Sequence, residues 1–364
     1  MYYNPLPALM KMFRTNNVDI RVHALWALSN LAGDCDDFKK IICTKELMDR
    51  TYQLLQDVTS IENLRTIAWG MTNFTQGCKK LSQEFRELAF QVVKFMMKFE
   101  DDDIEHSNIW SLCSLTSGED NDSWILEEMQ TEEFGIFDRV RKHLKSDNTQ
   151  VLVSCLRICI NYAASNDEIA QMFIDEDLLK DMAPLIHHKS PEVRKEVVVV
   201  ICNLAACTSG FQIDFLISQP IFKESLVLIN DASEKVREEA SWIYNNLASS
   251  CTDEQLLQTL SLKVLDNIKE ALSLKDPGIM IFLLKFIEAL LKAGQHESEQ
   301  AGDTSNQVAV LLDESGCLTA LENAQDMQEE IYNKIVEIIE TYYGVDDETS
   351  EVPIEVPDGG FDFS

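Results

Sequence analysis

The sequence predicts an all-α fold, a right-handed superhelical solenoid of about eight stacked repeats, and three observations predict it. Strand signals are sparse along the chain, helix-start signals recur at regular intervals, and a Trp followed four residues later by an Asn returns in the same phase. A single globular domain would not repeat itself in this way. The pairs in phase are Trp26 with Asn30, Trp69 with Asn73, and Trp242 with Asn246, and Asn161 and Asn203 hold the second position in two further copies.

The repeat period indicates the class of solenoid. Successive first positions of the pattern are separated by 43, 41, 47, 42, 43 and 43 residues, at Trp26, Trp69, Trp110, Arg157, Val199, Trp242 and Lys285. A helical period in the low forties is typical of armadillo and HEAT units, which stack because one unit cannot bury its core alone. We therefore expect one continuous armadillo-repeat domain over residues 1–343, followed by an acidic, disordered tail over residues 344–364.

Helix-start signals recur where the last helix of each unit should begin. Ser190 precedes Pro191 and Asp276 precedes Pro277, so each pair offers an N-cap followed by a Pro at the first helical position. Equivalent signals lie at residues 146–147 and 231–233. The polar stretch that follows Gly294 resembles a mobile loop, and two more helices should follow it to about Tyr343.

The helix predicted after Ser233 has two distinct faces. At about 100° of rotation per residue, one face is an apolar stripe that should pack on neighbouring units, formed by Val236, Ala240, Ile243 and Leu247. Glu239, Trp242 and Asn246 fall together on a second face. An acid, an indole and an amide could line a groove there.

Composition excludes several function classes. The formal net charge of -31 argues against nucleic acid and anionic membranes as direct partners and for a basic one, although net charge alone is explained better as a means of keeping a long surface soluble. The ten cysteines contain no CxxC pair and are expected to be buried free thiols in a reducing compartment, with no zinc site and no cofactor. No segment approaches the roughly 20 apolar residues that span a bilayer, and no catalytic constellation is recognised, so we expect no enzyme.

The repeated residue types suit an extended, basic peptide. Asn side chains can bond to peptide backbone, and Trp side chains one repeat apart form slots for the stems of Lys or Arg. Asp34 and Glu239 are acids that could hold the ligand's ammonium or guanidinium group. For one Trp–Asn pair a packing role is the better explanation, but three pairs in phase reverse that preference, since packing alone would not require Asn.

Several segments resemble the importin-alpha family, the adaptors that bind basic nuclear localisation signals. The matching segments are VHALWALSNLAGD (22–34), LRTIAWGMTNFTQG (64–77), IWSLCSLTSG (109–118), LRICINYAAS (156–165) and EEASWIYNNLASS (238–250), with further likeness toward the end of the chain and in the terminal GGFDF. By this resemblance the chain corresponds to the third through tenth repeats of the family. The resemblance also implies a location in the cytoplasm and nucleus.

The family's binding residues carry over position by position. In its major signal-binding site, Trp26, Asn30, Trp69 and Asn73 match the last two Trp–Asn pairs, and Asp34 matches the acid that receives the key lysine. For the minor site the resemblance implies Asn203, Trp242 and Asn246, with Glu196 and Glu239 as their acids. Arg157 fits the family's central repeats, and Trp110 and Asn161 lie in the same phase.

Departures from the family pattern leave two hypotheses open. Val199 stands where Trp is expected, Ser114 where Tyr is usual, and Thr66 where Asn is common; we also expect no basic importin-beta-binding segment. The first hypothesis is a nuclear import adaptor for basic signals of cargo proteins, with importin-beta and the export receptor that recycles importin-alpha as the further partners that the family implies. The second is an armadillo-type scaffold or decoy that does not recruit importin-beta.

Overall fold

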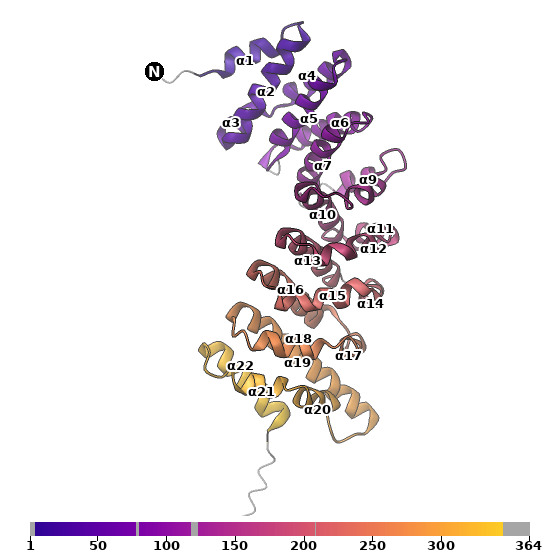
Figure 1. Ribbon diagram of the computed structural model, residues 1–364, viewed down its shortest axis with the longest axis vertical. Coiled ribbons are helices and arrows are strands. Elements are labelled where there is room, and N and C mark those ends of the chain that lie inside the picture. Colours follow the sequence, from indigo (N-terminus) through magenta and orange to yellow (C-terminus); the bar gives the residue numbers. More distant parts are fainter. Residues whose placement is uncertain (1–3, 78–79, 118–122, 208, 345–364) are drawn as a thin grey trace, which may run out of the picture.

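The computed structural model of the chain describes residues 4–77, 80–117, 123–207 and 209–344. Every regular element in these ranges is a helix, and the helices form a bowed stack that runs from one end of the molecule to the other (Figure 1). Eight helices, here called the ladder helices, follow one another through the stack, each in contact with the next: α2 (Val18–Asp34), α5 (Ile61–Thr75), α7 (Asp102–Thr116), α10 (Thr149–Ala163), α13 (Pro191–Ala205), α16 (Glu234–Ser250), α19 (Pro277–Ala301) and α22 (Glu329–Tyr343). The all-α armadillo solenoid is confirmed.

Shorter helices complete each repeat. In Figure 1, α11, α14 and α17 lie on the side of the stack opposite α13, α16 and α22. These helices are α1 (Leu6–Phe13), α3 (Asp36–Ile42), α4 (Lys45–Asp57), α6 (Gln83–Met96), α8 (Ser123–Met129), α9 (Ile136–His143), α11 (Asp167–Asp175), α12 (Leu178–Met182), η3 (Ala183–His187), α14 (Gly210–Ser218), α15 (Pro220–Val227), η4 (Leu228–Asn230), α17 (Asp253–Leu260), α18 (Val264–Leu272), α20 (Gln307–Glu314) and α21 (Cys317–Glu322). The acidic tail predicted for residues 344–364 lies, apart from Gly344, outside the described residues.

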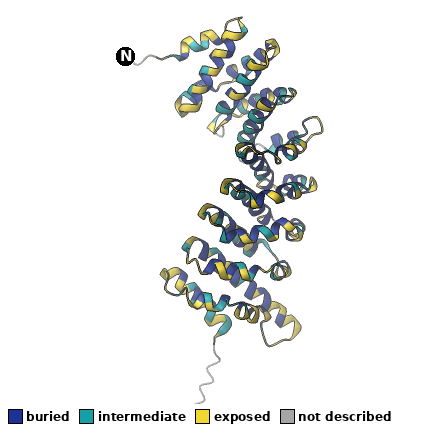
Figure 2. Ribbon diagram, in the orientation of Figure 1, coloured by how far each residue is buried: buried dark blue, intermediate teal, exposed yellow. Residues whose placement is uncertain are grey.

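The apolar core runs along the inside of the stack as one continuous cluster (Figure 2). On α16 the predicted stripe is fully buried, with 0% exposure at Val236, Ala240, Ile243 and Leu247. Because each ladder helix buries such a stripe between its neighbours, its exposed face is held in a fixed orientation relative to theirs.

The predicted helix starts agree closely with the observed ones. Asp276 caps α19, and its Oδ1 accepts from the backbone N–H of Gly278 at 3.0 Å. Ser190 is the N-cap of α13 and Ser233 that of α16. The signal at residues 146–147 lies slightly early, because the N-cap of α10 is Asn148, whose Oδ1 accepts from the N–H of Gln150 at 3.0 Å.

The loop predicted from Gly294 begins later, because α19 continues as a helix to Ala301 and has Gly302, whose φ is 74°, as its C-cap; the non-helical stretch is residues 302–306. The Gln and Glu residues of this stretch are good helix formers despite their polarity. Ser298 Oγ donates to the carbonyl oxygen of Gly294 at 2.9 Å, inside the helix. His296 Nδ1 lies 2.9 Å from Asp253 Oδ2 on α17, so the extension is tied to the preceding repeat.

Arginine–aspartate pairs, here called the clamps, join a ladder helix to the residues around the start of the next one. Each places a guanidinium nitrogen within hydrogen-bonding distance of a carboxylate. The three clamps are Arg21 with Asp57 at 2.9 Å, Arg65 with Asp101 at 2.8 Å, and Arg194 with Asp231 at 2.7 Å. Their regular placement fixes the angle between successive repeats.

On α7 the two charges of this contact change places: the ladder helix supplies the acid and its neighbour supplies the bases. Glu105 is 6% exposed, and its carboxylate receives Arg139 at 3.0 Å and Lys142 at 2.9 Å, with His143 Nε2 at 3.2 Å. The close contact with His143 is the main cause that holds the pKa of Glu105 well below its usual range, and the hydrogen bonds from Lys142 and Arg139 add to it. A buried acid therefore replaces the arginine in this repeat.

The nine cysteines in the described ranges form no disulfide. Burial raises the pKa of the Cys159 and Cys202 thiols to about 12, which keeps them protonated and unreactive. Within the same ranges no group of His, Cys, Asp and Glu is arranged to hold a metal ion. No helix there is both long and apolar enough to cross a membrane.

Candidate functional site

The first three predicted site residues share one exposed face of α2. Trp26, Asn30 and Asp34 are spaced by four residues, which brings them to within about 40° of one another per step around the helix axis. Trp26 is 47% exposed, unusually open for an indole. Within the described part of the chain, neither the Asn30 amide nor the Asp34 carboxylate makes a side-chain hydrogen bond or ion pair, so both are free to meet a ligand.

Trp69 and Trp110 line one cleft of about 590 Å³ between α5, α7 and α10. Asp103 and His106 of α7 also face this cleft. Burial is the main cause that lowers the pKa of His106, so the imidazole is neutral at pH 7 and adds no positive charge to the cleft. Arg65 also lines the cleft, and its Nε lies 3.4 Å from Asp103 Oδ2, so the charge of this acid is partly compensated. The two indoles offer a slot for the stem of a basic side chain.

Asn73 of α5 lies against Gly33 of α2. A Cβ at Gly33 would stand only 3.1 Å from the Asn73 side chain, so the absence of a side chain at Gly33 lets the two ladder helices approach there. Asn73 is half-buried and makes no side-chain hydrogen bond among the described residues. Its amide is therefore placed between two repeats with its bonding capacity unused.

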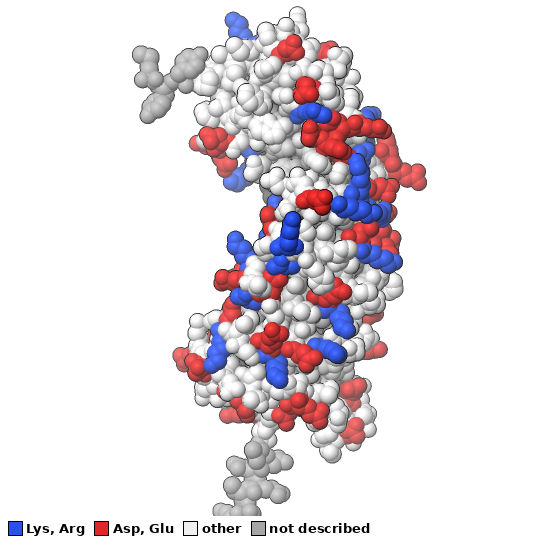
Figure 3. All heavy atoms as spheres, in the orientation of Figure 1, with Lys and Arg blue, Asp and Glu red and all other residues white. Residues whose placement is uncertain are grey.

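The middle of the ladder carries an internal ion pair. Arg157 on α10 donates from Nε at 3.2 Å and from Nη2 at 3.1 Å to Oε1 of Glu196 on α13. Glu196 is 4% exposed, and Lys195 Nζ lies 3.4 Å from the same oxygen. Figure 3 shows acidic and basic side chains interleaved over the lower half of this view. The resemblance implied Glu196 as an acid for a ligand, but in this structure its charge is already compensated.

Glu239 is an unpaired acid among the residues predicted for the minor site. It lies on α16 one turn before Trp242 and has no ion pair within the described residues. Burial raises the pKa of its carboxyl, and the charges of Glu196 and Glu238 add to the effect, although Lys195 opposes it. A half-buried carboxylate without a partner is a place where a ligand cation would be stabilised.

Two of the predicted Asn residues bond within the protein. Asn161 Nδ2 donates to the Cys113 carbonyl oxygen at 3.0 Å and to Thr116 Oγ1 at 2.7 Å. Asn246 Nδ2 donates to the Cys202 carbonyl oxygen at 2.9 Å. In both cases the amide connects a ladder helix to the preceding one. The argument that packing would not require Asn is therefore wrong for these two positions.

The side chains of Asn30, Asn73 and Asn203 differ from those two. None of the three makes a hydrogen bond to another described residue. The repeated Asn thus has two uses in one chain, as an inter-repeat tie at Asn161 and Asn246 and as an open amide elsewhere. Sequence phase alone cannot separate the two, because both uses place the Asn at the same point of the helix.

Trp242 is 45% exposed, but one neighbour was not foreseen. The Phe282 ring on α19 lies 4.5 Å from its ring, centroid to centroid, at an interplanar angle of 45°. Phe282 precedes the repeat-phase position Lys285 by three residues, about one helical turn. A search one turn before each repeat-phase residue would have found it.

Other groove residues missed from the sequence are charged. Lys195 Nζ lies 3.4 Å from Glu196 Oε1, and its positive charge also acts on the Glu239 carboxyl. Lys285 Nζ donates to Asn245 Oδ1 at 2.9 Å and to Ser249 Oγ at 2.8 Å. The signal for Lys285 was present, since it holds the Trp position of its repeat. No sequence signal indicated that its ammonium would be held by the preceding ladder helix.

Comparison with known proteins agrees with this architecture. Residues 4–33 match the armadillo/beta-catenin-like repeat family, and residues 306–358 match the atypical Arm repeat family. A designed armadillo repeat protein superposes with a TM-score of 0.58 at 20% identity, covering 67% of this chain and 99% of the designed one. Another, solved in complex with peptide (KR)4, gives a TM-score of 0.52 at 20% identity over 79% of this chain and 100% of its own. These likenesses show the fold.

The relatives by sequence are importin alpha subunits. Importin subunit alpha-1b of Oryza sativa subsp. japonica is 26% identical over 98% of this chain and 69% of its own length. Importin subunit alpha-3 of Arabidopsis thaliana is 26% identical over 98% of this chain and 67% of its own length. Because the likeness extends over nearly the whole chain and the fold is the armadillo stack, the chain is a divergent relative of the importin alpha subunits.

Proposed function

We propose that the chain is a nuclear import adaptor that binds basic nuclear localisation signals of cargo proteins along its ladder helices. The observation that carries the proposal is the set of three exposed indoles, Trp26, Trp69 and Trp242, at 42–47% exposure in the same repeat phase. One exposed Trp needs no explanation, but exposed indoles that recur in phase along one row of helices are typical of an interaction surface. The ligand is an extended peptide, and the protein contributes binding without chemistry.

Electrostatics support a basic ligand. Asp34 stands one turn after Asn30, Asp103 faces the Trp69 cleft, and Glu239 stands one turn before Trp242. An acid therefore accompanies each indole region, and the net charge of -31 attracts a cation from a distance. Each cation–π contact supplies about 0.5–2 kcal/mol. A peptide with several Lys or Arg residues would add such contacts along the ladder.

Two sequence relatives and one designed protein with the same fold support the proposal. The sequence relatives are named as importin subunits, and one designed armadillo protein with the same fold was solved with the alternating Lys-Arg peptide (KR)4. For this chain we propose the same class of ligand, a location shared between cytoplasm and nucleus, and importin-beta and the recycling export receptor as further partners.

Fluorescence anisotropy with labelled (KR)4 tests the proposal. Trp26→Ala with Trp69→Ala should weaken binding at least tenfold, and Trp242→Ala should weaken it further. Phe211→Ala is the control, because Phe211 is an exposed aromatic residue, at 70%, that lies on α14 and not on a ladder helix. Binding that survives loss of all three indoles would refute the groove.

A second function is favoured by the Arg157–Glu196 pair. Because the pair compensates the acid in the middle of the ladder, the two halves of the groove are separated by internal charge. This would suit a scaffold or decoy that holds a short basic segment without supporting import. Transport of a fluorescent signal-bearing cargo in permeabilised cells, with importin-beta supplied, distinguishes the two: import by this chain excludes the scaffold, and binding without import favours it.

A further inference from the structure

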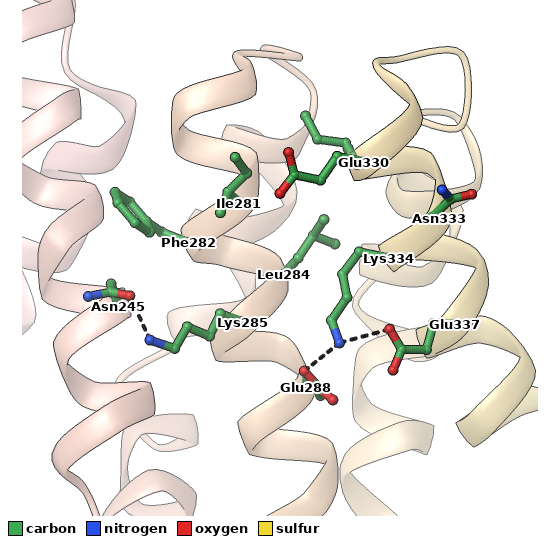
Figure 4. A pocket seen from close by; sticks show the side chains of 11 residues that line it. Asn245, Ile281, Phe282, Leu284, Lys285, Glu288, Glu330, Asn333, Lys334 and Glu337 are labelled. Atoms are coloured by element: carbon green, nitrogen blue, oxygen red, sulfur yellow. Dashed lines mark hydrogen bonds and ion pairs between the residues drawn. The ribbon is translucent and has the colours of Figure 1, made fainter.

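A pocket of about 540 Å³ lies beyond Trp242, enclosed by α16, α19 and α22 (Figure 4). Leu284 and Ile331, both nearly fully buried, form part of its lining from two ladder helices. Ile281 stands at the open side with 44% of its surface exposed. The volume of the pocket is in the range that holds a small ligand or one large side chain. Apolar side chains therefore reach solvent at this point of the ladder.

The two lysines of the pocket are already held by the protein. Lys285 donates to Asn245 and Ser249 of α16. Lys334 Nζ lies 2.8 Å from Glu288 Oε2 and 3.0 Å from Glu337 Oε2 (Figure 4). Because their ends are fixed, their hydrocarbon stems extend the apolar lining. Glu330 is the lining acid that has no ion pair among the described residues.

Lys285 changes what this repeat can accept. It occupies the phase held by Trp26, Trp69 and Trp242, so the indole that would stack on a ligand's Lys or Arg is replaced by a fixed ammonium. A ligand cation next to Lys285 would meet like charge. The side chain that fits this slot is apolar.

The pocket is continuous with the groove. Phe282 lines it and also contacts the Trp242 ring at 4.5 Å, centroid to centroid. An extended peptide advances about 3.3 Å per residue, so a chain bound at Trp242 reaches the far side of Phe282 within a few residues. The same peptide can therefore occupy both places.

We propose that this pocket binds an aliphatic or aromatic side chain of the same basic peptide, so that the ligand consists of a basic cluster with an apolar anchor to one side of it. The inference rests on the proposed function. Charge complementarity supports it, because unpaired Glu330 at the pocket favours a Lys or Arg next to the anchor. Burial of a Leu or Phe side chain in the pocket should raise the affinity by more than it costs to order that part of the peptide.

The test compares (KR)4 with peptides that add one Leu or one Phe at two, four or six residues before or after the basic cluster, on a Ser-Gly background. Anisotropy should show about a tenfold gain for the anchor on one side only. In Ile281→Ser the ratio of the two affinities should fall to about one. Ile281 is exposed, so this substitution leaves the core intact. Ile41→Ser is the matched control, because Ile41 is an exposed Ile on α3 and should retain the gain.

The outcomes separate this inference from the proposed function. A ratio near one for every anchored peptide in the unmodified protein overturns the pocket while (KR)4 binding upholds the groove. A gain that persists in Ile281→Ser overturns it as well. If (KR)4 alone does not bind, the proposed function fails; anchored peptides that bind in an Ile281-dependent way then still support the pocket, and anchored peptides that do not bind overturn it too.

Discussion

Arg157 contacts Glu196 through one carboxylate oxygen, Oε1, which accepts from both Nε and Nη2 of the guanidinium, at 3.2 and 3.1 Å. The pair bridges α10 and α13 at the middle of the ladder. Glu196 is buried while Arg157 remains partly exposed. Removal of Arg157 and removal of Glu196 should therefore lower the stability of the protein by different amounts.

Arg157→Ala should destabilise the protein by about 1–3 kcal/mol, because it leaves the buried Glu196 carboxylate with Lys195 as its remaining cation. Glu196→Gln should cost less, since the exposed guanidinium can be solvated. Chemical unfolding followed by circular dichroism, together with hydrogen exchange in α10 and α13, measures both. Equal costs for the two variants would contradict the asymmetry.

The same Arg157→Ala substitution should increase the affinity for a long basic peptide that spans both halves of the ladder. Removing the guanidinium exposes the Glu196 charge to the ligand and removes a like charge from its path. Anisotropy with a twelve-residue Lys-Arg peptide should show a several-fold gain, and (KR)4, which need not cross the middle, should change less. No difference between the two peptides would argue against a continuous groove.

Asn246→Ala and Asn30→Ala should separate the two uses of the repeated Asn. Asn246 donates to the Cys202 carbonyl, so its loss should lower stability by about 1 kcal/mol, whereas loss of Asn30 should be nearly neutral for folding. Thermal unfolding measures this contrast. For peptide binding we expect Asn30→Ala to weaken (KR)4, since its open amide is available to the peptide backbone. If Asn246→Ala unfolds at the same temperature as the unmodified protein, the interpretation of Asn246 as a tie between repeats is wrong.

Glu239→Gln should stabilise the protein at neutral pH and weaken the basic ligand by about 1–2 kcal/mol. Because the folded protein raises the pKa of this carboxyl, the folded state takes up a proton more readily than the unfolded chain, so the charged form costs stability above that pKa. Affinity for the peptide should therefore fall as the pH drops from neutral toward the raised pKa, above the ordinary 4.5.

The pH series for Glu239 is best measured in a Trp69→Ala background, because His106 lies in the Trp69 cleft and also titrates. In that background Glu239→Gln should make the affinity independent of pH over the same range. A parallel decline in both proteins would assign the effect to another group.

Glu105→Gln should cost about 2–3 kcal/mol at pH 7, since it leaves Arg139, Lys142 and buried His143 without their shared acid. The folded pKa of Glu105 is depressed, so its contribution is present above the ordinary pKa of 4.5 and is lost as the pH falls below it. Urea unfolding at pH 7, 5 and 3 should show the difference between the two proteins shrinking.

The control for Glu105 is Asp138→Asn, which removes an acid that is 88% exposed on the neighbouring helix α9. Its cost should stay within about 0.5 kcal/mol at every pH. A comparable cost for both variants would mean that burial of Glu105 is not what gives it weight.

Much of the fold followed from periodicity. The stripe on α16 and the caps at Asp276 and Ser233 depend on spacing within one helix, and spacing is directly visible in a sequence. The loop was predicted to begin too early, at Gly294, because polar residues were interpreted as irregular structure, although Gln and Glu favour helices.

The site was predicted less completely. Which residues are exposed followed from the phase of Trp26, Trp69 and Trp242, but the contacts between repeats did not. The Phe282 ring on Trp242, the Arg157 ion pair and the Asn246 hydrogen bond all join residues about 40 positions apart. Such pairs depend on the exact rise and rotation between repeats, which a single sequence does not state.

The reversed contact on α7 gives the repeats a fixed order. Three repeats present an arginine to the aspartate of the next unit, whereas the α7 repeat presents buried Glu105 to a basic neighbour. Transplanting the α7 unit into the place of the α13 unit would set Glu105 against Asp231, acid against acid, and duplication of the unit would leave an uncompensated carboxylate at the junction. The α7 unit is therefore not interchangeable with the units that carry an Arg–Asp clamp, and the reversed contact fixes its place in the stack.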